Sequence, residues 1–151
     1  MKVHAMPGHL IRRLNQISTQ VFSRHMADAG YDLTPVQFAA LDAIIDRPGI
    51  DQASVAAAIA YDRATIGGVI DRLEQKGLVR REVSRHDRRA REVRPTDDGR
   101  TLFEASLPVV TALQDEMLHR LTEAERETFI VLARKAIGPV GEPPATPARR
   151  T

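Results

Sequence analysis

A mainly α-helical fold with one small β-hairpin is predicted by three features of this 151-residue sequence. Apolar residues recur every three or four positions along most of the chain, the spacing that places them on one side of an α-helix. Helix-start signals stand at Thr34, Asp51, Asp62 and Thr96. Between residues 79 and 94 the pattern changes to alternation on either side of a charged turn. Two short helices followed by such a hairpin, or wing, predict a winged helix-turn-helix.

The first two helices are predicted at about residues 9–27 and 35–46. The first has a single apolar stripe, formed by Leu10, Leu14, Ile17 and Val21. The second has Thr34 as its N-cap, Pro35 at its first position and Gln37 completing a capping box. Arg47-Pro48-Gly49 ends this second helix.

The next two helices form the predicted helix-turn-helix. Asp51 is expected to cap the first of them, and Asp62 is expected to cap the second after a tight turn at Ala60-Tyr61. The core positions of the second follow the i, i+3, i+4, i+7 pattern and are Ile66, Val69, Ile70 and Leu73. Its opposite side is small and polar, and Gly77 ends it.

The wing is the most strongly charged segment of the chain. Residues 79–94 contain seven arginines and three acidic residues, whereas the whole chain has a net charge of only +2. A basic patch on a nearly neutral protein indicates binding to a polyanion. The alternative is a solvated arginine-rich hairpin with no ligand.

Two further helices are predicted over residues 97–137. Thr96 caps the first of them, Pro108 interrupts it, and Thr122 with Glu125 forms a capping box for the second. The segment 138–151 is rich in Pro, Gly and small residues and is expected to be a disordered tail. Residues 1–137 are therefore expected to form one domain.

Composition excludes several classes of function. The chain has no cysteine, so disulfides and thiolate chemistry are excluded. The five histidines show no paired ligand spacing, and neither a metal site nor a cofactor is expected. No nucleophile stands at a recognisable spacing from a base, so an enzyme is not expected. No apolar run reaches the roughly 20 residues that span a bilayer, and there is no signal-peptide core, so a cytoplasmic protein with no membrane partner is expected.

The ordered set of these motifs resembles the MarR family of bacterial transcription regulators. Thr34-Pro35-x-Gln37-Phe38 is similar to the start of the family's second helix. Asp62-Arg63-Ala64-Thr65, followed by Ile70-Asp71-Arg72-Leu73-Glu74-x-Lys76-Gly77-Leu78-Val79, is similar to its recognition helix. Asp87-Arg88-Arg89 resembles its wing tip, and Thr96-x-x-Gly99 the start of its fifth helix. The resemblance covers residues 9–137.

The resemblance implies a homodimer that binds double-stranded DNA. The winged helix-turn-helix would span about residues 33–96, with dimerisation helices at about 9–27 and 97–137. A dimer presents its two recognition helices to successive major grooves, so a palindromic operator is expected. The resemblance also implies a repressor that is released by a small effector, in many relatives an aromatic carboxylate or its thioester.

The residues expected at the DNA lie on the recognition helix and the wing. Two adjacent glycines inside a helix are unusual, because each costs on the order of 1 kcal/mol relative to alanine, and they are expected to let the helix backbone approach the groove. The resemblance implies that the wing aspartate positions an arginine in the minor groove. The expected DNA-binding residues are Arg63, Thr65, Gly67, Gly68, Arg72, Arg85, Asp87, Arg88, Arg89 and Arg91.

The resemblance places an effector pocket between the dimerisation helices and the winged domain. Its candidate lining residues are His9, Arg13, Leu14, Ile17, Phe38, Leu41 and Leu102. Each of them has the alternative role of a surface or interface residue. Because aromatic residues make up only 4% of the chain, an aromatic-rich pocket is not expected. The rival hypotheses are a constitutive DNA-binding or architectural protein without an effector, and a winged helix that binds protein.

Overall fold

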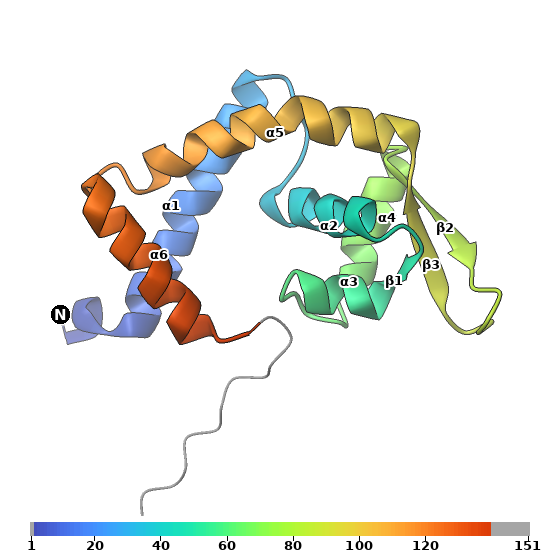
Figure 1. Cartoon of the computed structure of the whole chain (residues 1–151), viewed down its shortest axis with the longest axis horizontal. Helices are drawn as coiled ribbons and strands as arrows, with labels where there is room; N and C mark the ends of the chain where they lie inside the picture. The colour runs from blue at the N-terminus through green and yellow to red at the C-terminus, as the bar shows by residue number, and fades with distance from the viewer. Residues whose placement is uncertain (1, 140–151) are drawn as a thin grey trace, which may run out of the picture.

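The computed structural model describes residues 2–139, which form six α-helices and one three-stranded sheet (Figure 1). The elements are η1 (Lys2–Ala5), α1 (Pro7–Asp28), α2 (Pro35–Asp46), β1 (Ile50–Asp51), α3 (Gln52–Ala58), α4 (Ile66–Gln75), β2 (Val79–Val83), β3 (Arg91–Pro95), α5 (Asp97–Met117) and α6 (Glu123–Ile137). This is the predicted mainly α fold with a winged helix-turn-helix. From residue 140 onward, the predicted tail lies outside the described residues.

The predicted capping boxes are present. The backbone N–H of Gln37 donates to Thr34 Oγ1 (3.2 Å), and Thr34 N–H donates to Gln37 Oε1 (3.3 Å). Thr122 and Glu125 repeat this arrangement at the start of α6. At the end of α2, Gly49 has a φ of 92°, a left-handed conformation that favours glycine. Local sequence therefore determines where these helices begin and end.

The cap of α3 makes the protein sensitive to acid. Asp51 accepts hydrogen bonds from Ser54 Oγ (2.7 Å) and Ser54 N–H (2.9 Å). These bonds stabilise the carboxylate and hold the pKa of Asp51 below its ordinary value of 3.8. A carboxyl group whose pKa is lower in the folded state than in the unfolded state stabilises the fold at pH values above the unfolded-state pKa. This stabilisation is lost as the pH falls through the folded-state pKa.

We therefore expect Asp51→Asn to lower the melting temperature at neutral pH, with the difference from wild type shrinking as pH falls below about 4. Asparagine also caps helices, so the substitution isolates the charge. The check is thermal unfolding of both proteins from pH 3 to pH 7. A difference that stays constant over this range would contradict the pKa argument.

The start of α4 differs from the prediction. Asp62 was expected to cap this helix, but the N-cap is Thr65, and its side chain makes no capping hydrogen bond. Residues 63–65 instead form a turn, in which Thr65 Oγ1 donates to the carbonyl oxygen of Asp62 (3.2 Å). Gly67 and Gly68 give the first turn of α4 a low helix propensity, which explains the late start. Arg63 consequently lies on a turn ahead of the helix.

The wing belongs to a sheet with the strand order β1-β3-β2. Strands β2 and β3 pair antiparallel, with Val79 opposite Pro95 and Val83 opposite Arg91. The two-residue strand β1 pairs with β3 on its other side. The sequence did not predict β1, because two residues are too few to show a periodicity.

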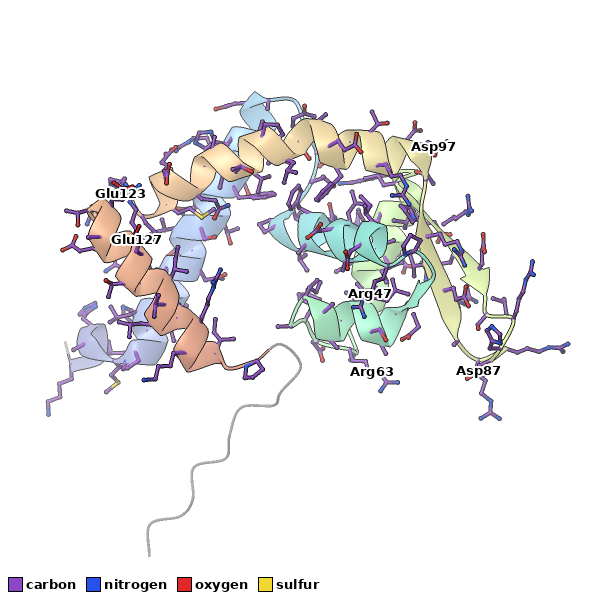
Figure 2. The ribbon with its side chains drawn as sticks, viewed as in Figure 1. Arg47, Arg63, Asp87, Asp97, Glu123 and Glu127 are labelled. Atoms are coloured by element: carbon purple, nitrogen blue, oxygen red, sulfur yellow. The ribbon has the colours of Figure 1, made fainter. Side chains whose placement is uncertain are left out.

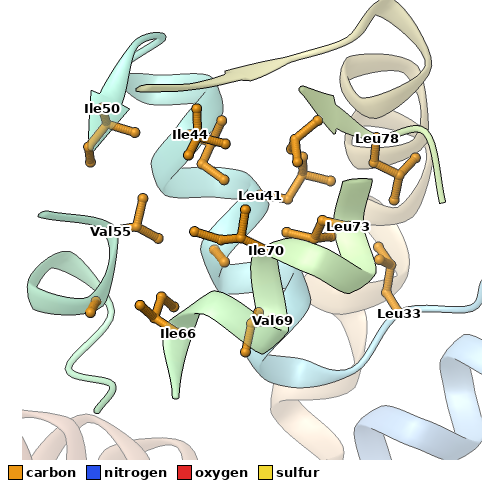
Figure 3. Close-up of a cluster of buried hydrophobic side chains, with 14 of the residues drawn as sticks. Leu33, Leu41, Ile44, Ile50, Val55, Ile66, Val69, Ile70, Leu73 and Leu78 are labelled. Atoms are coloured by element: carbon orange, nitrogen blue, oxygen red, sulfur yellow. The ribbon is translucent and has the colours of Figure 1, made fainter. Parts of the chain in front are cut away.

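The hydrophobic core of the winged domain lies between α2, α3, α4 and the sheet (Figure 3). All four predicted core positions of α4 are buried. Leu41 and Ile44 of α2 have no exposed surface. Full burial of each such side chain contributes about 1.5–3 kcal/mol. The core therefore fixes α4 with its opposite side towards solvent.

Helices α1 and α6 lie on the other side of the molecule, and α5 runs from the end of β3 across to them (Figure 1). The C-terminal half of α1 is buried against the core through Val21, Phe22 and Met26. Arg24 and His25 of α1 both contact the carboxylate of Glu116 on α5, and the hydrogen bond from His25 is the main cause of a lowered pKa of Glu116. No residue of α6 is buried in the single chain.

Helix α5 begins in tight contact with the turn that follows α4. Thr96 Oγ1 donates to the carbonyl oxygen of Gly77 (2.6 Å), and Thr96 N–H donates to that of Leu78 (3.0 Å). Gly99 N–H donates to Thr96 Oγ1 (3.0 Å). A Cβ atom added to Gly99 would lie 2.0 Å from the carbonyl oxygen of Leu78. Glycine at this position therefore permits the contact between α5 and the turn that follows α4.

We expect Gly99→Ala to destabilise the fold by about 1–3 kcal/mol, because a backbone oxygen cannot move aside as a flexible side chain can. Gly8→Ala is the matched control, since its added Cβ would meet no neighbouring atom within 4 Å in the part of the chain that the structure describes. Urea unfolding at equal protein concentration measures both changes. Equal free energies of unfolding for the two variants would show that the backbone near Leu78 adjusts to the added methyl group without loss of stability.

Candidate nucleic-acid interface

The turn that precedes α4 and the tip of the wing lie along one edge of the molecule. Figure 2 shows Arg63, on the turn before α4, and Asp87, at the tip of the hairpin, on the same lower edge. The side chains of Arg63, Thr65 and Arg72 are exposed. This arrangement matches a helix that enters a major groove beside a ribbon that follows the phosphates or the minor groove.

Backbone hydrogen bonds to two polar side chains shape the wing tip. Ser84, a buried residue, accepts from the N–H groups of His86 (3.2 Å) and Asp87 (3.3 Å) through its Oγ. Asp87 Oδ1 accepts from Arg89 N–H (2.9 Å), so the aspartate holds the backbone of Arg89 and leaves its guanidinium exposed. Ser84 was missed from the sequence, although serine is typical of such turns.

Six of the seven wing arginines divide into two groups. Arg80 pairs with Glu82 (2.9 Å), and Arg94 pairs with Glu82 (3.4 Å) and Glu92 (3.2 Å). A second group is exposed and forms no salt bridge within the part of the chain that the structure describes: Arg85, Arg88, Arg89 and Arg91. The excess positive charge of the wing is therefore concentrated at its tip.

Arg81, the seventh, belongs to neither group, and no separate role was predicted for it. Its guanidinium contacts Asp71 and Glu74 of α4, and its side chain is only 14% exposed. Burial, followed by repulsion from Arg91, lowers the pKa of Arg81. Arginine nevertheless stays protonated in proteins. Its charge faces the recognition helix and is not presented to solvent.

The two glycines of α4 are not required by packing within the chain. Among the described residues, no atom outside the helix lies within 4 Å of a Cβ added to Gly68, and a Cβ added to Gly67 would meet Gln52 Nε2 at 3.7 Å. The space above Gly68 is open and lies on the exposed side of α4. Alanine would therefore fit at either position, and a reason for glycine must be sought outside the single chain.

The structure does not gather the seven predicted effector-binding residues around one cavity. Leu41 is fully buried and presents no surface to a ligand, while Phe38 and Leu102 are half-buried against the core. Arg13 and Ile17 are exposed along α1. His9 Nε2 lies 3.3 Å from His4 Nδ1. Among the seven, only Leu14 lines the large apolar groove described below.

Three of the four phenylalanines form one cluster where α1, α2 and α5 meet. Phe38 stacks on Phe103 with ring centroids 4.8 Å apart, and Phe22 meets Phe38 edge-on at 6.0 Å. The low aromatic content argued against an aromatic-rich site, but an overall percentage carries no information about clustering. The cluster lies at the junction where the effector pocket was expected.

A groove of about 750 Å³ runs between α1, α5 and α6. It is lined mainly by apolar side chains, among them Ile11 of α1, Met117 of α5 and Leu132 of α6. Ile11 is 66% exposed and Leu132 is 58% exposed. Such a large exposed apolar surface marks a binding site for protein or ligand.

Residues 2–139 contain neither a membrane-spanning helix nor a cluster of metal ligands. Over this range no helix combines the length and apolarity needed to cross a membrane. Within the same residues no three His, Cys, Asp or Glu side chains are grouped so that they could hold a metal ion.

A winged helix-turn-helix with an exposed recognition helix and a basic wing tip defines a DNA-binding transcription regulator. Residues 31–90 match the family model described as MarR family. Together with the relatives below, this match shows that the chain belongs to the MarR family.

Two curated relatives and one solved structure illustrate the similarity. The chain is 38% identical to the transcriptional regulator HosA of Escherichia coli O157:H7, over 77% of this chain and 88% of HosA. It is 34% identical to the transcriptional repressor NicR of Pseudomonas putida, over 86% and 81% of the two chains. Its structure matches that of Bordetella bronchiseptica BpsR with a TM-score of 0.78 and 34% identity, over 87% and 98% of the chains; 6-hydroxynicotinic acid regulates DNA binding by BpsR.

Proposed function

We propose that this protein is a homodimeric, ligand-responsive repressor that binds a palindromic operator in the cytoplasm and acts by binding rather than catalysis. The observation that carries the proposal is the edge shared by Arg63, on the turn before α4, and the wing tip, where four exposed arginines form no salt bridge within the described residues. Two such edges, related by a two-fold axis, would read two half-sites about one helical turn apart.

Helix α6 supports the dimer. It has 15 residues and buries none of them in the single chain, although isolated helices of this length are marginal in water. Its apolar side chains Ile130, Val131, Leu132 and Ile137 are all exposed, as are Leu10 and Ile11 of α1. A second copy of the chain would cover both surfaces.

In the proposed complex, each element has its own role at the DNA. Arg63, Thr65 and Arg72 contact bases or phosphates in the major groove, where Gly67 and Gly68 permit a close approach of the backbone. Arg89 enters the minor groove, held at its backbone by Asp87. The remaining exposed arginines of the tip, Arg85, Arg88 and Arg91, neutralise phosphates.

The proposed effector is a small aromatic carboxylate. Its support is the phenylalanine cluster at the junction of α1, α2 and α5, and the regulation of BpsR by 6-hydroxynicotinic acid. Arg13 of α1 supplies an exposed guanidinium, a group that binds carboxylates bidentately. A ligand at this junction controls DNA binding if it prefers one separation of the two recognition helices.

The proposal is tested by footprinting on the DNA upstream of the protein's own gene, with the stoichiometry of the complex measured by analytical ultracentrifugation. We expect a protected palindrome that binds two chains. An aromatic carboxylate that binds the native protein should raise the melting temperature, because a ligand of the native state stabilises it by mass action. The same carboxylate should release the protein from the operator. If none of the carboxylates that stabilise the protein weakens its binding to the operator, a constitutive DNA-binding protein would be favoured.

Gly68→Ala separates fold stability from DNA binding. Alanine should stabilise α4 by up to about 1 kcal/mol relative to glycine. It should also weaken operator binding, because its methyl group fills the space that the groove needs. Melting temperature and operator affinity are measured on the same preparation. Unchanged affinity would mean that the groove does not approach the helix at Gly68.

A further inference from the structure

Arg81 joins three elements of the DNA-binding unit from the middle of strand β2. Its Nε donates to Glu74 Oε2 (3.0 Å), and its Nη2 donates to Asp71 Oδ1. Its Nη1 donates to Gln52 Oε1 of α3 (3.1 Å), while its backbone N–H lies 3.4 Å from Glu74 Oε1. One guanidinium thus connects the wing, the recognition helix and the helix before it.

The two contacts that Arg81 makes with α4, at Asp71 and Glu74, restrict the orientation of this helix. Asp71 and Glu74 are three residues apart, so they lie on one side of the helix and one turn along its axis. Two points of attachment on one rigid fork resist both rotation and tilt of the helix, because the guanidinium is planar. The side chains of α4 that pack into the hydrophobic core are Ile66, Val69, Ile70 and Leu73.

We infer that Arg81 is a positioning residue that fixes the recognition helix relative to the wing and thereby sets operator specificity without contacting DNA itself. This inference rests on the proposed function. Specific contacts to base edges depend on the placement of the helix within the groove. Nonspecific binding depends on the number of phosphates that are neutralised. Loss of Arg81 should therefore reduce specific binding much more than nonspecific binding.

One double variant distinguishes the positioning role of Arg81 from a purely electrostatic effect on operator affinity. Asp71→Ala combined with Glu74→Ala removes two carboxylates from α4, the helix that enters the groove in the proposed complex. If charge alone decided affinity, this double variant would bind the operator more tightly than wild type. If the contacts with Arg81 determine operator affinity, the double variant should bind the operator less tightly than wild type. Alanine has the highest helix propensity, so α4 itself is not weakened.

The experiment measures fluorescence anisotropy on an operator duplex and on a scrambled duplex of equal length, at several salt concentrations. The proteins are wild type, Arg81→Met, the Asp71→Ala/Glu74→Ala variant and, as a matched control, Arg80→Ala. We expect the first two variants to bind the operator about tenfold more weakly, with the slope of log affinity against log salt unchanged for Arg81→Met. Melting temperatures establish that each variant is folded.

The outcomes are distinct. A salt slope that falls by about one per subunit in Arg81→Met would show a phosphate contact and overturn the inference. Operator binding by the double alanine variant that equals or exceeds wild type would also overturn it. Wild-type protein that binds both duplexes equally would overturn the proposed function, and the inference with it. Selective wild-type binding with a loss of selectivity in both variants supports the inference.

Discussion

Leu132→Glu in α6 should convert the dimer to a monomer and weaken operator binding by about 100-fold or more. Leu132 is 58% exposed in the single chain and lines the apolar groove between α1, α5 and α6. A carboxylate there costs the monomer little, because it remains in water. In the proposed interface it would be buried without a partner, which is strongly unfavourable. Loss of the dimer removes the second half-site contact, and with it the avidity for a palindrome.

Sedimentation velocity and operator anisotropy measure the two consequences of this change. Thr128→Glu is the matched control, since Thr128 is exposed on the same helix and lies outside the groove. It should leave the dimer and its affinity intact. A Leu132→Glu protein that sediments as a dimer would place the interface elsewhere.

Replacing both Arg88 and Arg89 by alanine should weaken operator binding on the order of 100-fold at physiological salt. Both side chains are exposed at the wing tip and form no salt bridge within the described residues, so their charges are available to DNA. Hydrogen bonds to charged groups contribute about 1.5–3 kcal/mol each. The dimer would lose four cationic contacts, which should reduce the salt slope by about three to four.

The control for this prediction is Arg80→Ala in the same hairpin. Arg80 is paired with Glu82, so its removal should change the salt slope little. Replacing A·T pairs beneath the wing by G·C should weaken the wild type more than the Arg88/Arg89 variant, because narrow minor grooves attract arginine. Equal salt slopes for the two variants would mean that the wing tip does not contact DNA.

Local patterns predicted most of the fold because its helices are delimited by short-range chemistry. The capping boxes at Thr34 and Thr122 and the core stripe of α4 depend on residues three or four positions apart, and the sequence displays them directly. The start of α4 was wrong by one turn. Asp62 is a good capping residue, but the glycines that follow it disfavour the first turn.

The candidate site was less predictable, since its arrangement depends on contacts between distant segments. Arg81 follows Gln52 by 29 positions, and nothing in the local sequence indicates that they meet. Charge counting treated all seven wing arginines alike, whereas three of them pair with carboxylates in the folded chain. Leu14 and Leu41 occupy similar positions in helical stripes, yet Leu14 is exposed and Leu41 is buried.

We propose that α4 and the wing tip form one specific DNA-binding surface. The most direct test is fluorescence anisotropy with the duplex upstream of the protein's own gene against a scrambled duplex, at several salt concentrations. We predict tight binding to the upstream duplex, weak binding to the scrambled duplex and a steep decrease of affinity with salt. Equal weak binding to both would contradict specific recognition at this site, and salt-insensitive or absent binding would indicate a protein partner.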